Sequence, residues 1–327
     1  MVTAKIRSEM RLTTGASGLR AICLLVFIFG FAATAFAGGT TPKEDVTPGS
    51  SHDYHRIQQF LQQLHVQYPQ ETELFSLGTS GTGESIDGIK IGHGPIHNLI
   101  VGTHHGNEYG ATEVAVGAAA DLAKMPISNQ TIFVIPVLNI SGFDTNRREE
   151  SLVGNGDDNT VDANRDYPGP CGTEGPFRLT STKALAELID RENIVASATL
   201  HTFKRLVAYP WGIATQDLST PYDQQFIDLA TLAATFSHNE VGNSTSALYA
   251  ANGTFEDYAF WKHGIWSLLF ELGGTHTPDP SEVAQLVAEN VPGLRKMMEG
   301  APTERAQDHA FHGKCDSRQM HIDLHNE

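Results

Sequence analysis

Short apolar runs alternate with helical patterns along most of this 327-residue chain, and this alternation restricts the fold more than any other feature. We expect strands at 85–92, 97–102, 131–139, 194–200, 205–209 and 266–271. Apolar residues at helical spacing predict helices at 54–64, 111–124, 181–191 and 222–237, and a last helix after Pro280. Continuous apolar strands separated by helices indicate a single α/β domain, in which helices flank a central mixed, largely parallel β-sheet.

Polar side chains stand where three of the expected strands end. His105 and Glu108 follow the strand at 97–102, His201 follows the strand at 194–200, and Glu271 ends the strand at 266–271. Ligand sites in open α/β sheets lie outside the carboxyl ends of the strands. We therefore expect these four side chains to meet in one site.

Two histidines and a glutamate from this group suit a metal ion. His105 and Glu108 lie in the turn GTHHGNEYG, and a distant His201 would complete a His₂Glu set. Three protein ligands with an open fourth position are typical of a catalytic zinc. We expect one Zn²⁺ per chain, with His104 left open as an alternative to its neighbour. A His-x-x-Glu turn alone is more often an ordinary surface turn.

Six blocks of sequence, in order, resemble the zinc metallocarboxypeptidase family, the funnelins. They are HHGNE at 104–108, NISGF at 139–143, VDANRDYPG at 161–169, LHTFKRLVAYPWG at 200–212, LYAANGTFEDYAFWKHGI at 248–265 and LLFELGG at 268–274. The resemblance runs from about residue 54 to about residue 299 and implies a carboxypeptidase-like catalytic domain at 51–300. It also implies hydrolysis of C-terminal residues from peptides by a zinc-activated water.

The resemblance assigns roles to the residues at the strand ends. It implies that His105, Glu108 and His201 are the zinc ligands. Asp162 matches the aspartate that orients the first histidine from behind, an arrangement usual around zinc-bound imidazole. Glu271 matches the general base that takes a proton from the attacking water and later delivers one to the leaving amine.

Further positions match groups that hold the substrate. Either Arg147 or Arg148 corresponds to the arginine that stabilises the oxyanion, and the sequence leaves both open. Asn164 and Arg165 match the pair that binds the terminal carboxylate of the substrate, for which a guanidinium is well shaped. Tyr249 matches the tyrosine that closes over the bound terminus.

Glu256 falls at the family's specificity position when residues are counted back from Glu271 without gaps. An acid there predicts a preference for C-terminal Lys or Arg, with Asp257 beside it contributing. The alternative is that Glu256 points away and stabilises the first turn of a helix that begins near Thr254.

The first 37 residues have the pattern of a secretory signal peptide. Basic residues lead into an apolar run at 21–37 that ends in Ala35-Phe36-Ala37, a small-x-small cleavage signal. An uncleaved anchor is the alternative, but the run is at the short limit for spanning a bilayer. We expect a secreted or periplasmic protein with no stable membrane anchor after cleavage, and a flexible lead-in at 38–50.

Net charge and cysteine content restrict the partners and the C-terminal region. The formal net charge of −16 argues against nucleic acid as a partner. The resemblance implies peptides or murein peptides as substrates. Only Cys171 and Cys315 lie beyond the signal peptide, and we expect them to form a disulfide. We interpret the polar, histidine-containing tail at 301–327 as a surface extension tied down by Cys315, in preference to a metal-binding tail.

Three other functions compete with that of a carboxypeptidase. A zinc amidase or endopeptidase acting on murein peptides would use the same zinc ligands. An acyl-amino-acid deacylase is less favoured, because the block at 200–212 weighs against it. A non-enzymatic binding protein of the same fold is disfavoured, because the zinc ligands and Glu271 are all present.

Overall fold

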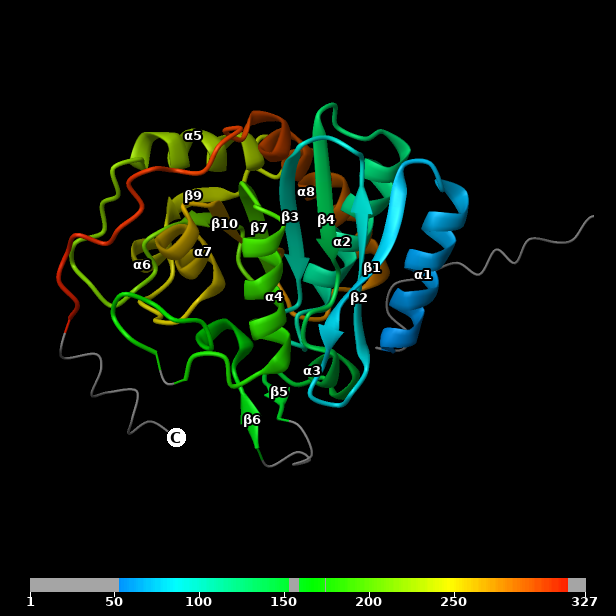
Figure 1. The fold of residues 1–327 in the computed structure, drawn as a ribbon, viewed down its shortest axis with the longest axis horizontal. Coiled ribbons are helices and arrows are strands. Elements are labelled where there is room, and N and C mark those ends of the chain that lie inside the picture. Colours follow the sequence, from blue (N-terminus) through cyan, green and yellow to red (C-terminus); the bar gives the residue numbers. More distant parts are fainter. Residues whose placement is uncertain (1–52, 153–158, 174, 317–327) are drawn as a thin grey trace, which may run out of the picture. The chain divides into compact units, whose positions relative to one another are not determined.

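A mixed eight-stranded sheet forms the centre of the part of the chain that the structure describes (Figure 1). This structure is a computed structural model, and it describes residues 53–152, 159–173 and 175–316, all within one compact unit. The predicted signal peptide at 1–37 and the lead-in at 38–50 lie outside the described residues. Within the described ranges, no helix has both the length and the apolar character needed to cross a membrane.

The sheet has the strand order β1-β2-β4-β3-β7-β10-β8-β9. Its strands are β1 Thr72–Thr79, β2 Ser85–Ile91, β3 Ile96–Gly102, β4 Gln130–Ile135, β7 Ala196–His201, β8 Leu206–Tyr209, β9 Glu240–Asn243 and β10 Trp266–Glu271. Strands β4, β3, β7 and β10 run parallel to one another, and antiparallel strands flank them. The predicted mixed, largely parallel sheet is therefore confirmed.

Helices cover the sheet and join its strands. They are α1 Tyr54–Gln67, α2 Tyr109–Lys124, α3 Ile140–Thr145, α4 Thr180–Arg191, α5 Asp223–Ala233, α6 Ser244–Ala247, α7 Phe255–His263 and α8 Pro280–Gly300. In Figure 1, α4 crosses the front of the sheet, and α2 and α8 lie behind it. Every residue of β7 is buried, as expected for a strand that is covered on both faces.

Several boundaries differ from the sequence prediction for local reasons. Strand β4 ends at Ile135, before the predicted limit of 139, because Pro136 has no N–H to donate to a neighbouring strand. Helix α8 begins at Pro280 itself, where Asp279 and Glu282 form a capping box. Helix α7 was anticipated only in the alternative considered for Glu256, which placed the start of a helix near Thr254, and the structure has this helix with Thr254 as its N-cap. Its first six residues are all buried, so it lacks the polar face that would reveal helical periodicity.

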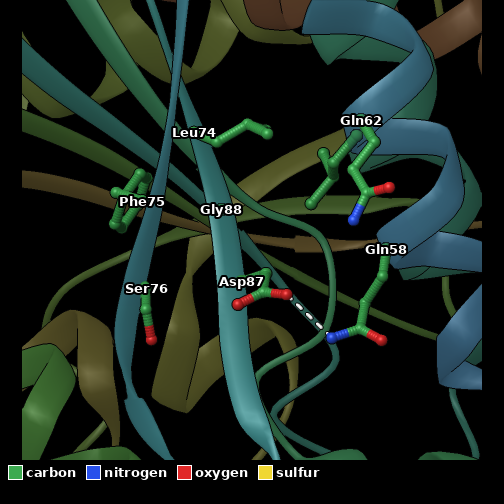
Figure 2. A pocket seen from close by; sticks show the side chains of 8 residues that line it. Gln58, Gln62, Leu74, Phe75, Ser76, Asp87 and Gly88 are labelled. Atoms are coloured by element: carbon green, nitrogen blue, oxygen red, sulfur yellow. Dashed lines mark hydrogen bonds between the residues drawn. The ribbon is translucent and has the colours of Figure 1, made fainter.

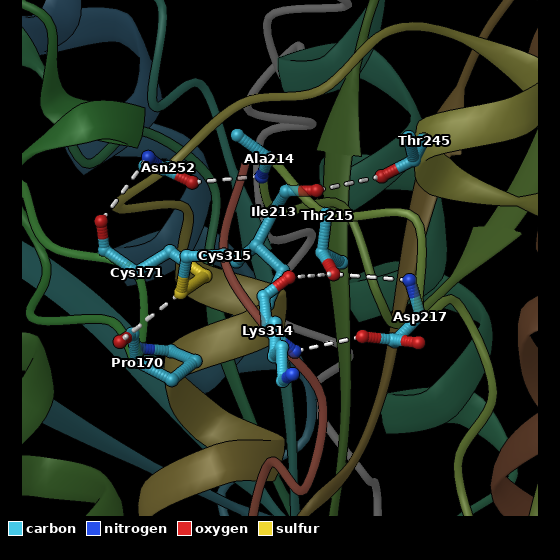
Figure 3. The surroundings of a disulfide bond; sticks show 10 residues. All are labelled: Pro170, Cys171, Ile213, Ala214, Thr215, Asp217, Thr245, Asn252, Lys314 and Cys315. Atoms are coloured by element: carbon cyan, nitrogen blue, oxygen red, sulfur yellow. Dashed lines mark hydrogen bonds between the residues drawn. A yellow bond between two sulfur atoms is a disulfide. The ribbon is translucent and has the colours of Figure 1, made fainter. Parts of the chain in front are cut away.

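The chain beyond α8 is fixed to the body of the protein by the expected disulfide, Cys171–Cys315 (Figure 3). The bond joins residues 144 positions apart. Around it, Thr215 Oγ1 donates to the carbonyl of Lys314 at 2.7 Å. Asn252 Nδ2 donates to the carbonyl of Cys171 at 3.4 Å. The described part of the tail therefore holds the loops at 169–172, 213–217 and 249–254 together.

A pocket of about 250 Å³ lies between α1, the edge strand β1 and its neighbour β2 (Figure 2). Gln58 Nε2 donates to Asp87 Oδ2 at 2.8 Å across its floor, so these polar groups satisfy one another. None of the predicted site residues lines this pocket.

A short hairpin of β5 Glu150–Ser151 and β6 Thr160–Val161 lies beside the first turn of α4. Glu150 is fully buried there. It accepts hydrogen bonds from Ser181 Oγ at 2.5 Å and from the backbone N–H of Gly81. Its Oε1 has no hydrogen-bond partner among the described residues. Burial raises the pKa of Glu150 to about 7, because ionisation would place a charge in a dry site.

The raised pKa of Glu150 predicts a loss of stability as the pH rises. The folded state holds the proton of Glu150 more tightly than the unfolded state does. The stabilisation that this proton contributes is complete below the unfolded pKa and is lost as the pH rises through the folded pKa. Relative to Glu150→Gln, the free energy of unfolding of the wild type should fall by roughly 2.5 kcal/mol between about pH 5 and pH 8. Denaturant unfolding at several pH values measures this. Glu187→Gln, on the exposed face of α4, is the control. Equal pH dependence in all three proteins would contradict the prediction.

Candidate metal and catalytic site

Two neighbouring parallel strands bring the predicted ligands together. His105 and Glu108 follow β3, and His201 is the last residue of β7. Because β3 and β7 pair in parallel, with Gly102 opposite Leu200, their carboxyl ends lie at the same edge of the sheet. All three ligand side chains are buried, and their ligand atoms lie within 4.8 Å of one another.

The geometry of this set fits a zinc ion. His105 Nδ1 lies 2.8 Å from Glu108 Oε1 and 3.1 Å from His201 Nδ1. Glu108 Oε2 lies 3.0 Å from His201 Nδ1. Tetrahedral zinc with bonds of about 2.0–2.1 Å would hold its ligand atoms about 3.3 Å apart. The three donors are thus already close to the required spacing, and two nitrogens with one oxygen suit zinc chemically.

His104, the alternative ligand, lies outside this set. Its Nδ1 is 3.1 Å from Thr199 Oγ1, and its Nε2 is 3.0 Å from the Tyr167 hydroxyl. Both ring nitrogens are therefore engaged away from Glu108 and His201. Burial lowers the pKa of His104 well below its usual value, and the two neighbouring histidines lower it further.

Asp162 lies behind His105, as the sequence predicts. Its Oδ1 is 3.0 Å from His105 Nε2, while its Oδ2 accepts from Arg148 Nε at 3.0 Å. Burial opposes the charged form of His105, but Glu108 and Asp162 outweigh this and raise its pKa. Asp162 therefore fixes the ring from the side opposite to the ligand atom.

The structure separates the two arginines that the sequence could not distinguish. Arg148 Nη1 lies 3.7 Å from Glu108 Oε1, and its Nη2 lies 3.0 Å from Asp162 Oδ2. Arg147 is exposed. Arg148 is therefore the arginine next to the ligand set.

Glu271 ends β10, directly beside His201 in the parallel pairing of β10 with β7. Burial, and after it the charge of Glu108, raise the pKa of Glu271 to about 8. The carboxyl therefore holds a proton more tightly than an exposed glutamate does. A carboxyl of this kind beside a metal site is suited to proton transfer.

The residues predicted to bind a terminal carboxylate lie at the mouth of the site. Arg165 Nη2 donates to the Tyr249 hydroxyl at 3.2 Å, and Tyr249 is 57% exposed. Asn164 is buried, and its Oδ1 accepts from the backbone N–H of Phe255 at 2.9 Å. Arg165 and Tyr249 are therefore the accessible members of the predicted group.

Glu256 is 1% exposed in the first turn of α7, and its Oε2 has no hydrogen-bond partner among the described residues. Asp257 accepts from the Gly212 N–H at 2.9 Å. Gly212 leaves room for this pair, since a Cβ there would lie 3.2 Å from Asp257 Oδ2 and 3.8 Å from Glu256 Oε1. Burial and the neighbouring Glu256 raise the pKa of Asp257 well above its usual value.

Two residues next to the predicted site residues were not singled out by the sequence analysis. Thr199 precedes His201 by two positions on β7, so both side chains leave the same face of the strand. That spacing could have revealed it. Ser244, whose Oγ is buried without a partner among the described residues, has its Cβ 3.1 Å from where a Cβ on Gly212 would lie. No local pattern places Ser244 there.

A ligand set of this composition at the ends of parallel strands, with a half-buried carboxyl beside it, is characteristic of α/β metallohydrolases. A sequence model for zinc carboxypeptidases matches residues 57–293, and the chain belongs to this zinc-dependent family. It is accordingly a zinc metallocarboxypeptidase.

Individual relatives agree with this assignment. Carboxypeptidase B from Astacus astacus is 28% identical over 268 residues, which cover 69% of this chain and 87% of that protein. Carboxypeptidase SOL1 from Arabidopsis thaliana is 26% identical over 246 residues. These cover 66% of this chain and 48% of that protein, so the chain spans about half of its length.

Solved structures with the same fold include bovine thrombin-activatable fibrinolysis inhibitor in complex with tick carboxypeptidase inhibitor. It has a TM-score of 0.69 at 17% identity, and the match covers 76% of this chain and 96% of that chain. Carboxypeptidase A from Helicoverpa armigera has a TM-score of 0.68 at 20% identity. The match covers 77% of this chain and 73% of that one. At this level of identity the likeness shows the carboxypeptidase fold.

Proposed function

We propose that this protein is a secreted carboxypeptidase that binds one zinc ion per chain and releases C-terminal Lys and Arg from peptides. The observation that carries the proposal is the placement of Glu271 beside the buried set of His105, Glu108 and His201. The unpaired, buried Glu256 supports the choice of substrate.

Each polar group around the ligand set has a role in peptide hydrolysis. Zinc, when bound, polarises the scissile carbonyl and lowers the pKa of water. Glu271 accepts the proton of the attacking water and returns it to the leaving amine. Arg148, held by Asp162 near Glu108, donates to the developing oxyanion. Arg165 pairs with the terminal carboxylate of the peptide, and Tyr249 closes over it.

Glu256 and Ser244 give the substrate pocket its preference. A buried carboxylate oxygen without a partner is costly, and a cationic side chain entering the pocket would supply the missing charge and hydrogen bond. Ser244 Oγ, also buried and unpaired among the described residues, offers that cation a second acceptor. The Glu256 carboxylate disfavours a murein peptide that ends in diaminopimelate. The side chain of diaminopimelate carries a carboxylate beside its ammonium group, and the two carboxylates would repel each other.

Glu271→Gln tests the assignment of the base. The amide keeps the shape of the carboxyl but cannot take a proton, so kcat should fall by about 10²–10⁴-fold. The zinc content, measured by elemental analysis, should stay at one ion per chain. Glu299→Gln, on the surface of α8, should leave both quantities unchanged. Turnover of Glu271→Gln within a few-fold of the wild type would mean that another group takes the proton.

Matched peptides ending in Arg, Lys, Leu and amidated Arg, together with a murein tripeptide, test the substrate class. We expect the highest kcat/KM for free Arg and Lys ends and no turnover of the amidated peptide. In Glu256→Gln, the ratio of kcat/KM for Arg over Leu should fall by about tenfold or more, because a desolvated charge pair is lost. Preference of the wild type for Leu, or an unchanged ratio in the variant, would refute the role of Glu256.

The signal sequence at 1–37 supports secretion. N-terminal sequencing of the active protein from the culture medium or periplasm should give a start at or near Gly38. An active protein that retains residues 1–37 would contradict this part of the proposal.

A further inference from the structure

His201 has a buried contact on the side of its ring that faces away from Glu108. Its Nδ1 belongs to the ligand set, 3.0 Å from Glu108 Oε2. Its Nε2 has two polar neighbours, Thr199 Oγ1 at 3.3 Å and Asn164 Nδ2 at 3.4 Å. His105 has the charged Asp162 in the corresponding position, so the two histidines are oriented by different chemistry.

Only one of these two neighbours can accept a hydrogen from His201. A neutral imidazole that gives its Nδ1 lone pair to a metal carries its proton on Nε2 and must donate there. The Asn164 amide nitrogen is itself a donor, and its Oδ1 is occupied by the N–H of Phe255. Within the described residues, the Thr199 hydroxyl is therefore the acceptor.

The hydrogens beyond Thr199 then have one direction. The buried hydroxyl, which accepts from His201, must also place its own hydrogen, and among the described residues His104 Nδ1 at 3.1 Å is the acceptor within reach, so it donates there. His104 then carries its proton on Nε2 and donates to the Tyr167 hydroxyl at 3.0 Å. Thr199, His104 and Tyr167 have no exposed surface, and His201 is 1% exposed, so water does not compete for these bonds.

Ring packing holds the same residues in place. The rings of His104 and His201 stack, with centroids 5.6 Å apart and planes inclined by 21°. His104 also packs against Phe255 and, edge-on, against Tyr167. These ring contacts therefore hold His104 in position independently of its hydrogen bond to Thr199.

We propose that Thr199 and His104 are positioning residues that fix the proton of His201 on Nε2 and so present Nδ1 to the zinc ion. This inference rests on the proposed zinc site. Removing either side chain keeps all three ligand residues. The His201 ring could then rotate, or carry its proton on Nδ1, which would block that nitrogen as a zinc ligand. Partners of this kind typically change metal affinity by 10–100-fold.

Zinc dissociation constants, measured by competition with a chromogenic chelator, test the proposal. Thr199→Val keeps the shape of the side chain, removes the acceptor and should weaken zinc binding by about 10–100-fold. Thr199→Ser should restore the affinity to within a few-fold. The control is Ser197→Ala, because Ser197 is a buried hydroxyl on the same strand that donates to Ser267 Oγ at 2.8 Å. It should lose stability without loss of zinc affinity.

His104→Phe and its combination with Thr199→Val provide a second test. If both residues act through one chain of bonds, the double variant should bind zinc no more weakly than Thr199→Val alone. Nitrogen NMR of the zinc-loaded wild type should show His201 protonated on Nε2. If Thr199→Val does not fold, His104→Phe and the NMR signal decide the question.

The outcomes separate this inference from the proposed function. A wild type that binds no zinc would refute the metal site itself. A wild type that binds zinc, together with Thr199→Val or His104→Phe of equal affinity, would refute only the positioning role. Fully additive losses in the double variant would likewise show that the two residues act independently.

Discussion

The parallel pairing of β3, β7 and β10 is the constraint on which the rest of this site depends. Hydrogen bonds between these strands fix the register, in which Gly102 lies opposite Leu200 and Glu271 opposite His201. Because side chains at the ends of parallel strands leave the sheet at one edge, residues far apart in sequence meet there. Helices cover both faces and make slippage by one residue costly, since it would turn buried side chains to the other face.

Most charges buried around this edge have partners. Glu108 lies between two histidines and receives the backbone N–H of Thr202, while Asp162 is held by His105 and Arg148. Unpaired buried polar groups are costly, so the few that persist need an explanation. Glu256 Oε2 is one of these within the described chain, and it lacks a partner beside Gly212; the explanation proposed above is that a cationic side chain of the substrate supplies that partner.

Much of the architecture was predictable because its signals are local. Continuous apolar runs marked the main strands, and amphipathic spacing marked α1, α2 and α4 to within a few residues. The sequence analysis did not predict β1 or the short strands β5, β6 and β9, and it reached α7 only as the alternative helix near Thr254. Their local patterns are weak, since α7 is buried on all sides in its first turns and a two-residue strand has no periodicity. Such elements form because contacts with the surrounding structure stabilise them.

The sequence by itself determined which residue types stand at the strand ends, and it marked His105, His201 and Glu271 through their positions after apolar runs. Only the tertiary structure decided between near neighbours. It turned His105 toward the ligand set and placed Arg148 beside Asp162. Adjacent residues share almost the same sequence context, but their side chains point in different directions. The backbone path and the packing of distant segments set those directions, and no local pattern records them.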